Sequence, residues 1–183
     1  PRVGLAGAPV LEPDLVLVAA GIADDRVPGY AQLVRLGASI HVFSPHDLED
    51  TYLPAFRDAV SEAHAQSVMC AYNAVDGFPA CASSMLLRDH LRGAWGFDGY
   101  VVSDCAALAD IATGHRFAPD FAHASAAAVK AGTDLECGYG KGQAFSALAD
   151  AARGNLISEP EIDTAVKRLF RARFRLGMFD PPD

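Results

Sequence analysis

Acidic side chains suited to hydrolysis follow short apolar stretches in the second half of the chain. Asp104 comes directly after residues 99–103 (GYVVS), and Asp134 and Glu136 lie within residues 132–136 (GTDLE). An ionised carboxylate at such a position can act as a nucleophile or a general base. Asp104 could instead cap a helix over residues 106–112, and the stretch itself supports the two interpretations about equally.

These acids need a sheet that brings them together. Residues 67–72 and 99–103 are short and apolar, which predicts buried strands, and residues 132–136 indicate a short strand that ends in acids. Helical patterns over residues 83–93 and 120–131 separate them, and such alternation predicts an α/β fold with parallel strands. The predicted strands end in polar groups, namely Tyr72 with Asn73, Ser103 with Asp104, and Asp134 with Glu136. The carboxyl ends of parallel barrel strands form one catalytic face, so we expect these side chains to lie close together.

The length of the chain bounds the architecture. A complete (β/α)8 TIM-type barrel takes about 250 residues, whereas this chain has 183 residues, of which 51% are hydrophobic. We therefore expect residues 1–183 to form a single domain that holds the C-terminal portion of a TIM-type barrel. Near its start, residues 12–24 have a helical composition and residues 39–43 indicate a strand.

Two serines mark helix starts. Ser44 is followed by Pro45 and Asp47, and Ser158 is followed by Glu161. In this pattern the serine caps the helix while the acid three residues later reaches back to the serine amide. The helix after Ser158 carries an apolar stripe that we expect to be buried, consisting of Ile162, Val166, Leu169, Phe170 and Phe174.

The composition excludes some classes of partner. The formal net charge of -8 repels a phosphate backbone, so we expect no nucleic-acid partner. No apolar run is long enough to span a bilayer, so we expect no membrane partner. The four cysteines contain no C-x-x-C pair, which argues against a zinc site, and we expect no cofactor. They could form bridges such as Cys70–Cys81 or Cys105–Cys137, or remain four reduced thiols.

Five segments of the chain resemble the N-terminal barrel domain of glycoside hydrolase family 3, the retaining β-glucosidases and β-xylosidases. They are residues 51–56 (TYLPAF), 67–81 (SVMCAYNAVDGFPAC), 86–105 (LLRDHLRGAWGFDGYVVSDC), 131–138 (AGTDLECG), and 156–159 (LISE) with 171–181 (RARFRLGMFDP). The resemblance covers residues 44–183, whereas residues 1–43 diverge. Cys105 and residues 134–138 are most similar to the β-xylosidase branch. The resemblance implies a β-xyloside or β-glucoside substrate, either an oligosaccharide or an aryl glycoside.

The resemblance also implies roles for individual residues. Asp104 matches the catalytic nucleophile, which forms a covalent glycosyl-enzyme ester. Tyr72 and Met69 match positions that line the sugar subsite, although a single apolar strand residue such as Met69 is more often packed in a core. His115 follows in the loop after Asp104 and could reach the substrate, although a lone loop histidine is usually a surface residue. We expect Asp134 and Glu136 to support loops rather than to react.

Several family features are missing. Leu5 stands where the family has a sugar-binding Arg, and residues 36–39 (LGAS) lack the Lys-His pair that grips sugar hydroxyls. The family's acid/base Glu comes from a separate C-terminal domain, and no glutamate here matches it. Loss of the general acid alone costs about 10²–10⁴-fold in rate, so we expect the isolated chain to be a weak or inactive glycosidase.

Two other functions are consistent with the sequence. The open edges of a partial parallel sheet could pair with another copy, giving a homo-oligomer that is a non-catalytic carbohydrate-binding or self-associating module. Alternatively, Asp104, Asp134, Glu136 and His115 could hold a divalent metal for hydrolysis. Their spacing supports a metal only weakly, so we expect none.

Overall fold

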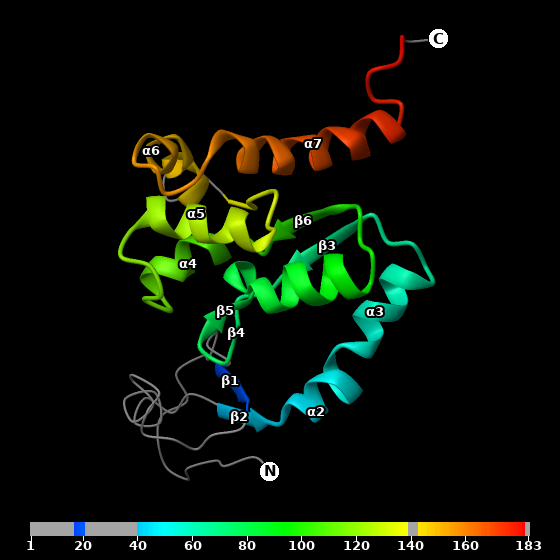
Figure 1. Cartoon of the computed structure of the whole chain (residues 1–183), viewed down its shortest axis with the longest axis vertical. Helices are drawn as coiled ribbons and strands as arrows, with labels where there is room; N and C mark the ends of the chain where they lie inside the picture. The colour runs from blue at the N-terminus through cyan, green and yellow to red at the C-terminus, as the bar shows by residue number, and fades with distance from the viewer. Residues whose placement is uncertain (1–16, 21–39, 139–142, 182–183) are drawn as a thin grey trace.

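The computed structural model describes residues 17–20, 40–138 and 143–181, which form an α/β fold with parallel strands (Figure 1). In chain order, the elements are β1 (Leu17–Ala20), β2 (Ile40–Phe43), α2 (Pro45–Asp47), the π-helical η1 (Leu48–Tyr52), α3 (Pro54–Ser61), β3 (Ser67–Cys70), β4 (Ala74–Val75), β5 (Phe78–Pro79), the 3₁₀ turn η2 (Ala80–Ala82), the π-helical η3 (Met85–Ala94), β6 (Tyr100–Ser103), α4 (Ala107–Thr113), α5 (Phe121–Ala131), the 3₁₀ turn η4 (Ala144–Ala147), α6 (Leu148–Arg153) and α7 (Glu159–Arg175). The predicted α/β class with parallel strands is thus confirmed, whereas the partial TIM-type barrel stays a prediction, because the strands of the described ranges do not close into a barrel.

Strand β6 is the centre of the expected functional edge. It pairs in parallel with β3, in a register that places Met69 beside Val102. On its other side Val102 forms a parallel bridge with Leu135, and the Ser103 amide donates to the Leu135 carbonyl at 2.9 Å. The three predicted strands therefore lie side by side in parallel, and the third is reduced to a single bridge.

A second sheet has the strand order β2-β1-β4-β5. Strand β1 pairs in parallel with β2 and β4, whereas β4 and β5 form an antiparallel hairpin. Asp76 and Gly77 make its turn with φ of 51° and 79°, as a two-residue hairpin of type I′ requires. The strand predicted over residues 39–43 is confirmed as β2. The helix predicted over residues 12–24 is wrong at residues 17–20 (LVAA), because so short an apolar run fits either period and here pairs with two strands.

Both predicted capping boxes are present. The Asp47 amide donates to Ser44 Oγ at 3.1 Å, and the Ser44 amide donates back to Asp47 at 2.8 Å. At the start of α7, the Ser158 amide and hydroxyl both donate to the Glu161 carboxylate, at 2.9 Å and 2.7 Å, in the second capping box. Hydrogen bonds from the two serines lower the pKa of both acids, since they stabilise the ionised carboxylates. Helices α2 and α7 therefore begin where the sequence predicts.

The main core lies between the β3–β6 sheet and helices η3, α4 and α5 (Figure 1). Val101, Leu108 and Ile111 are fully buried there. The Cys70–Cys81 disulfide joins the end of β3 to η2 within this core, and a second disulfide joins Cys105 to Cys137. Of the alternatives open for the cysteines, the structure therefore contains both bridges.

Helix α7 is covered only in part. Its predicted apolar stripe is half-buried at Ile162 but 42% exposed at Val166 and 64% exposed at Phe174. Figure 1 shows the reason, since the C-terminal part of α7 runs on past α5 and α6. Phe174 packs instead on Phe179, with ring centroids 4.6 Å apart. No helix in the described ranges combines the length and apolarity needed to cross a membrane.

Candidate active site

Asp104 lies at the carboxyl end of β6. Its amide donates to the Cys70 carbonyl at 2.9 Å, which extends the β3–β6 ladder to this residue. Its Oδ1 accepts from the Cys105 amide at 2.7 Å, whereas Oδ2 has no hydrogen-bond partner among the described residues. A half-buried carboxylate with one oxygen fixed and the other available is suited to nucleophilic attack.

The side chain of Asp104 does not cap the following helix. Helix α4 begins after Ala106, and no side chain caps it. Ala106 has a φ of 69°, a left-handed conformation that is costly for a residue with a Cβ. Such backbone strain is concentrated at functional sites. The interpretation of Asp104 as a simple helix cap is therefore wrong.

A disulfide holds the loop after Asp104. It joins Cys105 to Cys137, which follows the third strand. The Ala106 amide donates to the Cys137 carbonyl at 2.8 Å, and the Cys137 amide donates to Ser103 Oγ at 3.0 Å. The backbone on both sides of Asp104 is thus tied to the neighbouring strand end.

Tyr72 and His115 join this network from the β3 side. The Tyr72 hydroxyl donates to the Cys105 carbonyl, and His115 Nε2 donates to the Tyr72 carbonyl at 2.7 Å. A phenol has a single proton, so Tyr72 cannot also donate to Asp104 in this arrangement. The structure links both predicted residues to the loop after Asp104, because Tyr72 supports the backbone of this loop and His115 in turn holds the backbone of Tyr72.

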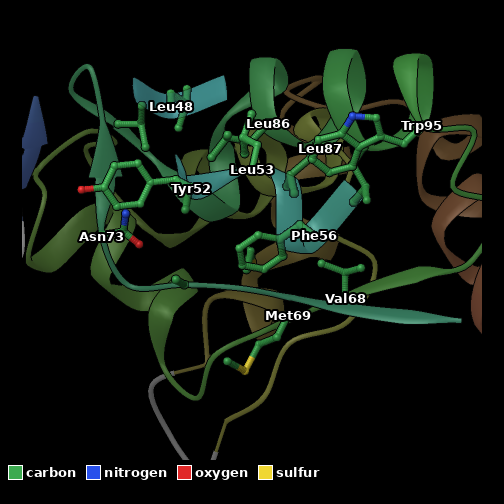
Figure 2. A pocket seen from close by; sticks show the side chains of 15 residues that line it. Leu48, Tyr52, Leu53, Phe56, Val68, Met69, Asn73, Leu86, Leu87 and Trp95 are labelled. Carbon is green, nitrogen blue, oxygen red and sulfur yellow. The ribbon is translucent and has the colours of Figure 1, made fainter. Parts of the chain in front are cut away.

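Met69 shares a sheet face with Asp104. It is the register partner of Val102, and residues two apart on a strand point to the same face, so Met69, Val102 and Asp104 face the same way. Met69 is 55% exposed and lies across β3 from Val68 (Figure 2). The core-packing interpretation of Met69 is therefore wrong for the described part of the chain.

An apolar pocket of about 270 Å³ lies between η1, α3, β3 and η3 (Figure 2). Leu53, Phe56, Leu86 and Trp95 form much of its wall. Sugar hydroxyls need convergent polar groups, and such a wall supplies few. The pocket is therefore a poor candidate for the sugar subsite.

Asp134 forms the centre of a buried charge network. Its Oδ2 accepts from Arg92 at 2.6 Å and from the Val101 amide at 2.9 Å, and its Oδ1 accepts from Arg168 at 2.9 Å. Burial lowers the pKa of Arg92, and the neighbouring Asp134 opposes this shift. Asp134 therefore fastens β6 to η3 and α7, as its predicted supporting role requires.

Glu136 also has a supporting role. Its carboxylate accepts from the Ala144 amide at 2.8 Å and from the Phe145 amide at 2.7 Å, at the start of η4. Within the described ranges, no three His, Cys, Asp or Glu side chains are grouped closely enough to hold a metal. The four residues considered as metal ligands are thus not brought together.

Two of the differences from the family lie outside the described residues, at Leu5 and at residues 36–39.

Arg92 and Arg168 could not be predicted from the sequence as partners of Asp134, because no local pattern links them to it. The basic side chain just before residues 95–98 (WGFD) was the only available signal for Arg92.

Comparison with known proteins agrees with this geometry. Residues 28–172 match the family described as "Glycosyl hydrolase family 3 N terminal domain". The chain belongs to glycoside hydrolase family 3. Among curated family 3 relatives, it is 42% identical over 151 residues to a xylan 1,4-beta-xylosidase of Xylanibacter ruminicola, a match that covers 82% of this chain and 17% of that protein. It is 41% identical over 155 residues to a probable exo-1,4-beta-xylosidase of Aspergillus clavatus, covering 80% of this chain and 20% of the relative.

Solved family 3 structures share the fold. An exo-beta-xylosidase in complex with a xylobiose aziridine probe is 38% identical to this chain, with a TM-score of 0.71. The match covers 75% of this chain and 18% of the xylosidase chain. A beta-glucosidase from Listeria innocua in complex with glucose is 36% identical to this chain, with a TM-score of 0.70. The match covers 76% of this chain and 19% of the glucosidase chain. The chain therefore spans about a fifth of the length of the family 3 proteins that it matches.

Proposed function

We propose that this chain is the C-terminal portion of the TIM-type barrel of a retaining β-glycosidase, with Asp104 as its nucleophile. The observation that carries the proposal is the position of Asp104 at the carboxyl end of β6, with Oδ2 unpartnered among the described residues. The family match over residues 28–172 includes this strand and both of its neighbours. Residues 1–183 form one domain in this proposal.

The reaction proceeds through a covalent ester. Asp104 Oδ2 attacks the anomeric carbon as the bond to the leaving oxygen breaks, and water later hydrolyses the glycosyl ester. The leaving oxygen needs a proton from a second carboxyl group. Asp134 and Glu136 are both engaged in the fold, so neither supplies it. The isolated chain is therefore expected to cleave slowly any glycoside whose leaving group requires protonation.

The substrate is a β-xyloside or a β-glucoside. Named relatives of both kinds support this class, since the matches include xylosidases and glucosidases. Met69 contacts the sugar from the same sheet face as Asp104, while Tyr72 and His115 shape the adjoining loop. The substrate partner is an oligosaccharide or an aryl glycoside.

Paired aryl substrates test the proposal. A dinitrophenyl β-xyloside has a leaving group that departs without protonation, whereas the mononitrophenyl β-xyloside depends more on an acid. We expect the isolated chain to release dinitrophenolate and to gain the mass of one glycosyl group on Asp104, with much slower release of mononitrophenolate. Asp104→Asn should abolish the adduct, whereas Asp110→Asn, the matched removal of a charge in α4, should not. Release without an adduct, or equal release by Asp104→Asn, would exclude Asp104 as the nucleophile.

A second candidate is a self-associating, non-catalytic module. The uncovered face of the β3–β6 sheet favours it, since Met69 is 55% and Leu135 is 38% exposed on that face. Exposed apolar sheet faces and edges promote association. Light scattering combined with xylose and glucose titrations separates the candidates. Stable dimers with no sugar binding and no Asp104 adduct would favour the module over the glycosidase.

A further inference from the structure

A basic cleft lies at the opposite end of β6 from Asp104. It has a volume of about 410 Å³ and is formed by η3, α5 and α7. Arg92, in its wall, donates to the Gly99 carbonyl at 3.0 Å, just before β6 begins. Strands rise about 3.3 Å per residue, so Gly99 and Asp104 are separated by about 16 Å along the strand. The cleft is therefore distinct from the candidate active site.

Positive charge dominates this cleft. Its lining includes four cationic side chains, those of Arg88, Arg92, Lys130 and Arg168. Two acids face them, Glu161 in the lining and the buried Asp134 beneath. Four positive and two negative charges leave a local net charge of +2, in a chain whose formal net charge is -8.

The two acids are already engaged, and Asp134 is engaged by two of the four cations of the cleft. Asp134 is shared by Arg92 and Arg168, so one carboxylate serves two guanidinium groups. Glu161 accepts hydrogen bonds from the Ser158 amide and hydroxyl in the capping box of α7, and the charges of Lys130 and Arg88 also help to lower its pKa, so it is already included in the net charge of the cleft. The excess positive charge in the cleft is therefore not neutralised by the described side chains that line it.

Hydrogen-bond donors also remain available. Arg92 Nε has no acceptor among the described residues but is buried, so the accessible donors are those of Arg88 and Lys130. Arg88 and Lys130 are exposed at the rim, and Arg88 approaches the Lys130 carbonyl at 3.5 Å, which keeps the two residues adjacent. Helices η3 and α5 end near this rim, and the negative ends of their dipoles act like about half a charge each. Against a local net charge of +2, these dipoles leave the cleft positive.

We propose that this cleft binds a small multivalent oxyanion, with the chemistry of inorganic phosphate or a phosphate monoester. Guanidinium groups match such oxygens with paired, charge-assisted hydrogen bonds. A multivalent anion can bridge the cations of η3, α5 and α7 at once, which a chloride ion cannot do. Binding therefore joins three helices at the end of β6 remote from Asp104.

A titration followed by amide NMR tests the proposal on the whole chain. Sodium phosphate is added at constant ionic strength maintained with sodium chloride, and glycerol 3-phosphate is titrated in parallel. We expect saturable shifts of the Gly93 and Gly132 amides with phosphate and none with chloride alone. Tighter binding of glycerol 3-phosphate would identify a monoester as the ligand, and tighter binding of phosphate would identify the free anion.

Variants at the rim supply the control. Arg88→Gln with Lys130→Gln should weaken binding about tenfold or more, and it leaves the buried Arg92 pairing intact. Arg57→Gln with Arg153→Gln removes the same charge from exposed positions on α3 and α6, and should leave the affinity unchanged. Shifts that do not saturate, or equal weakening by the two double variants, would overturn the proposal whatever the role of Asp104.

Discussion

Replacing Asp134 with Asn tests the most deeply buried charges of the fold. The Asp134 side chain is fully buried, and those of its partners Arg92 and Arg168 are 13% and 24% exposed. Asparagine keeps the shape but removes the charge that both guanidinium groups share. Removing one partner of a buried ion pair costs about 3–5 kcal/mol. Because both arginines retain some contact with water, we expect a loss near the lower end, about 3 kcal/mol.

Urea unfolding measures this loss, followed by circular dichroism and by the fluorescence of Trp95, the single tryptophan. Asp98→Asn is the matched control, because Asp98 pairs with Arg175 at 3.0 Å while both side chains are about half exposed. Exposed pairs contribute at most about 1 kcal/mol. If Asp134→Asn destabilises the chain no more than Asp98→Asn does, the buried triad is not the main link between β6, η3 and α7.

Three further predictions concern stability. Replacing both Cys105 and Cys137 with Ser should lower the free energy of unfolding by about 2–4 kcal/mol, because their bridge closes a loop across 32 positions. His90 should stabilise the fold below its ordinary pKa. Burial lowers its pKa, but hydrogen bonds to a backbone carbonyl and to Glu49 at 2.6 Å outweigh burial and raise it. The stabilisation is therefore complete below about pH 6.5, the pKa of an unfolded histidine. It is lost as the pH rises through the higher pKa of His90 in the folded chain. His90→Asn should remove this pH dependence from urea midpoints measured between about pH 5.5 and 8.5. Ser158→Ala should cost up to about 1 kcal/mol, since it removes the hydroxyl that bonds Glu161 in the capping box of α7.

Each of these predictions has its own control. Unchanged stability on loss of the 105–137 bridge would mean that the reduced chain holds the loop equally well. A pH dependence that persists in His90→Asn would assign it to another group. Ser84→Ala is the control for Ser158→Ala, because Ser84 precedes η3 without capping it through its side chain. Equal losses in these two serine variants would contradict the capping argument.

Local sequence patterns predicted those elements whose packing in the fold agrees with the local preference. Strand β6 and helix α5 follow from composition and turn residues, and both capping boxes follow from serine–acid spacing. Strand β1 was mistaken for helix because its four residues carry no clear period, and pairing with β2 and β4 decides its conformation. The stripe of α7 was overestimated because periodicity shows which residues share a face, and not whether another element covers that face.

The candidate site was predictable at its centre and not around it. The position of Asp104 could be predicted because Asp104 follows a strand whose motif is specific. The hydrogen bonds that support it could not be predicted, since they join residues separated by many positions, such as Tyr72 with Cys105. The buried triad joins residues 92, 134 and 168, and only the packing of η3 and α7 against β6 brings them together.

The backbone hydrogen bonds at the carboxyl end of β6 limit how fast this part of the site can move. Ser103 donates to Leu135, Asp104 to Cys70 and Ala106 to Cys137, so three nearby amides are anchored on two different neighbours of the strand. Hydrogen exchange at each of these amides requires its own neighbouring segment to separate from this strand end, so exchange of all three requires both sides of the strand to open. These three amides should thus be among the slowest of the chain to exchange. Any motion that admits a substrate on the timescale of turnover must therefore arise in elements other than the β3–β6 edge.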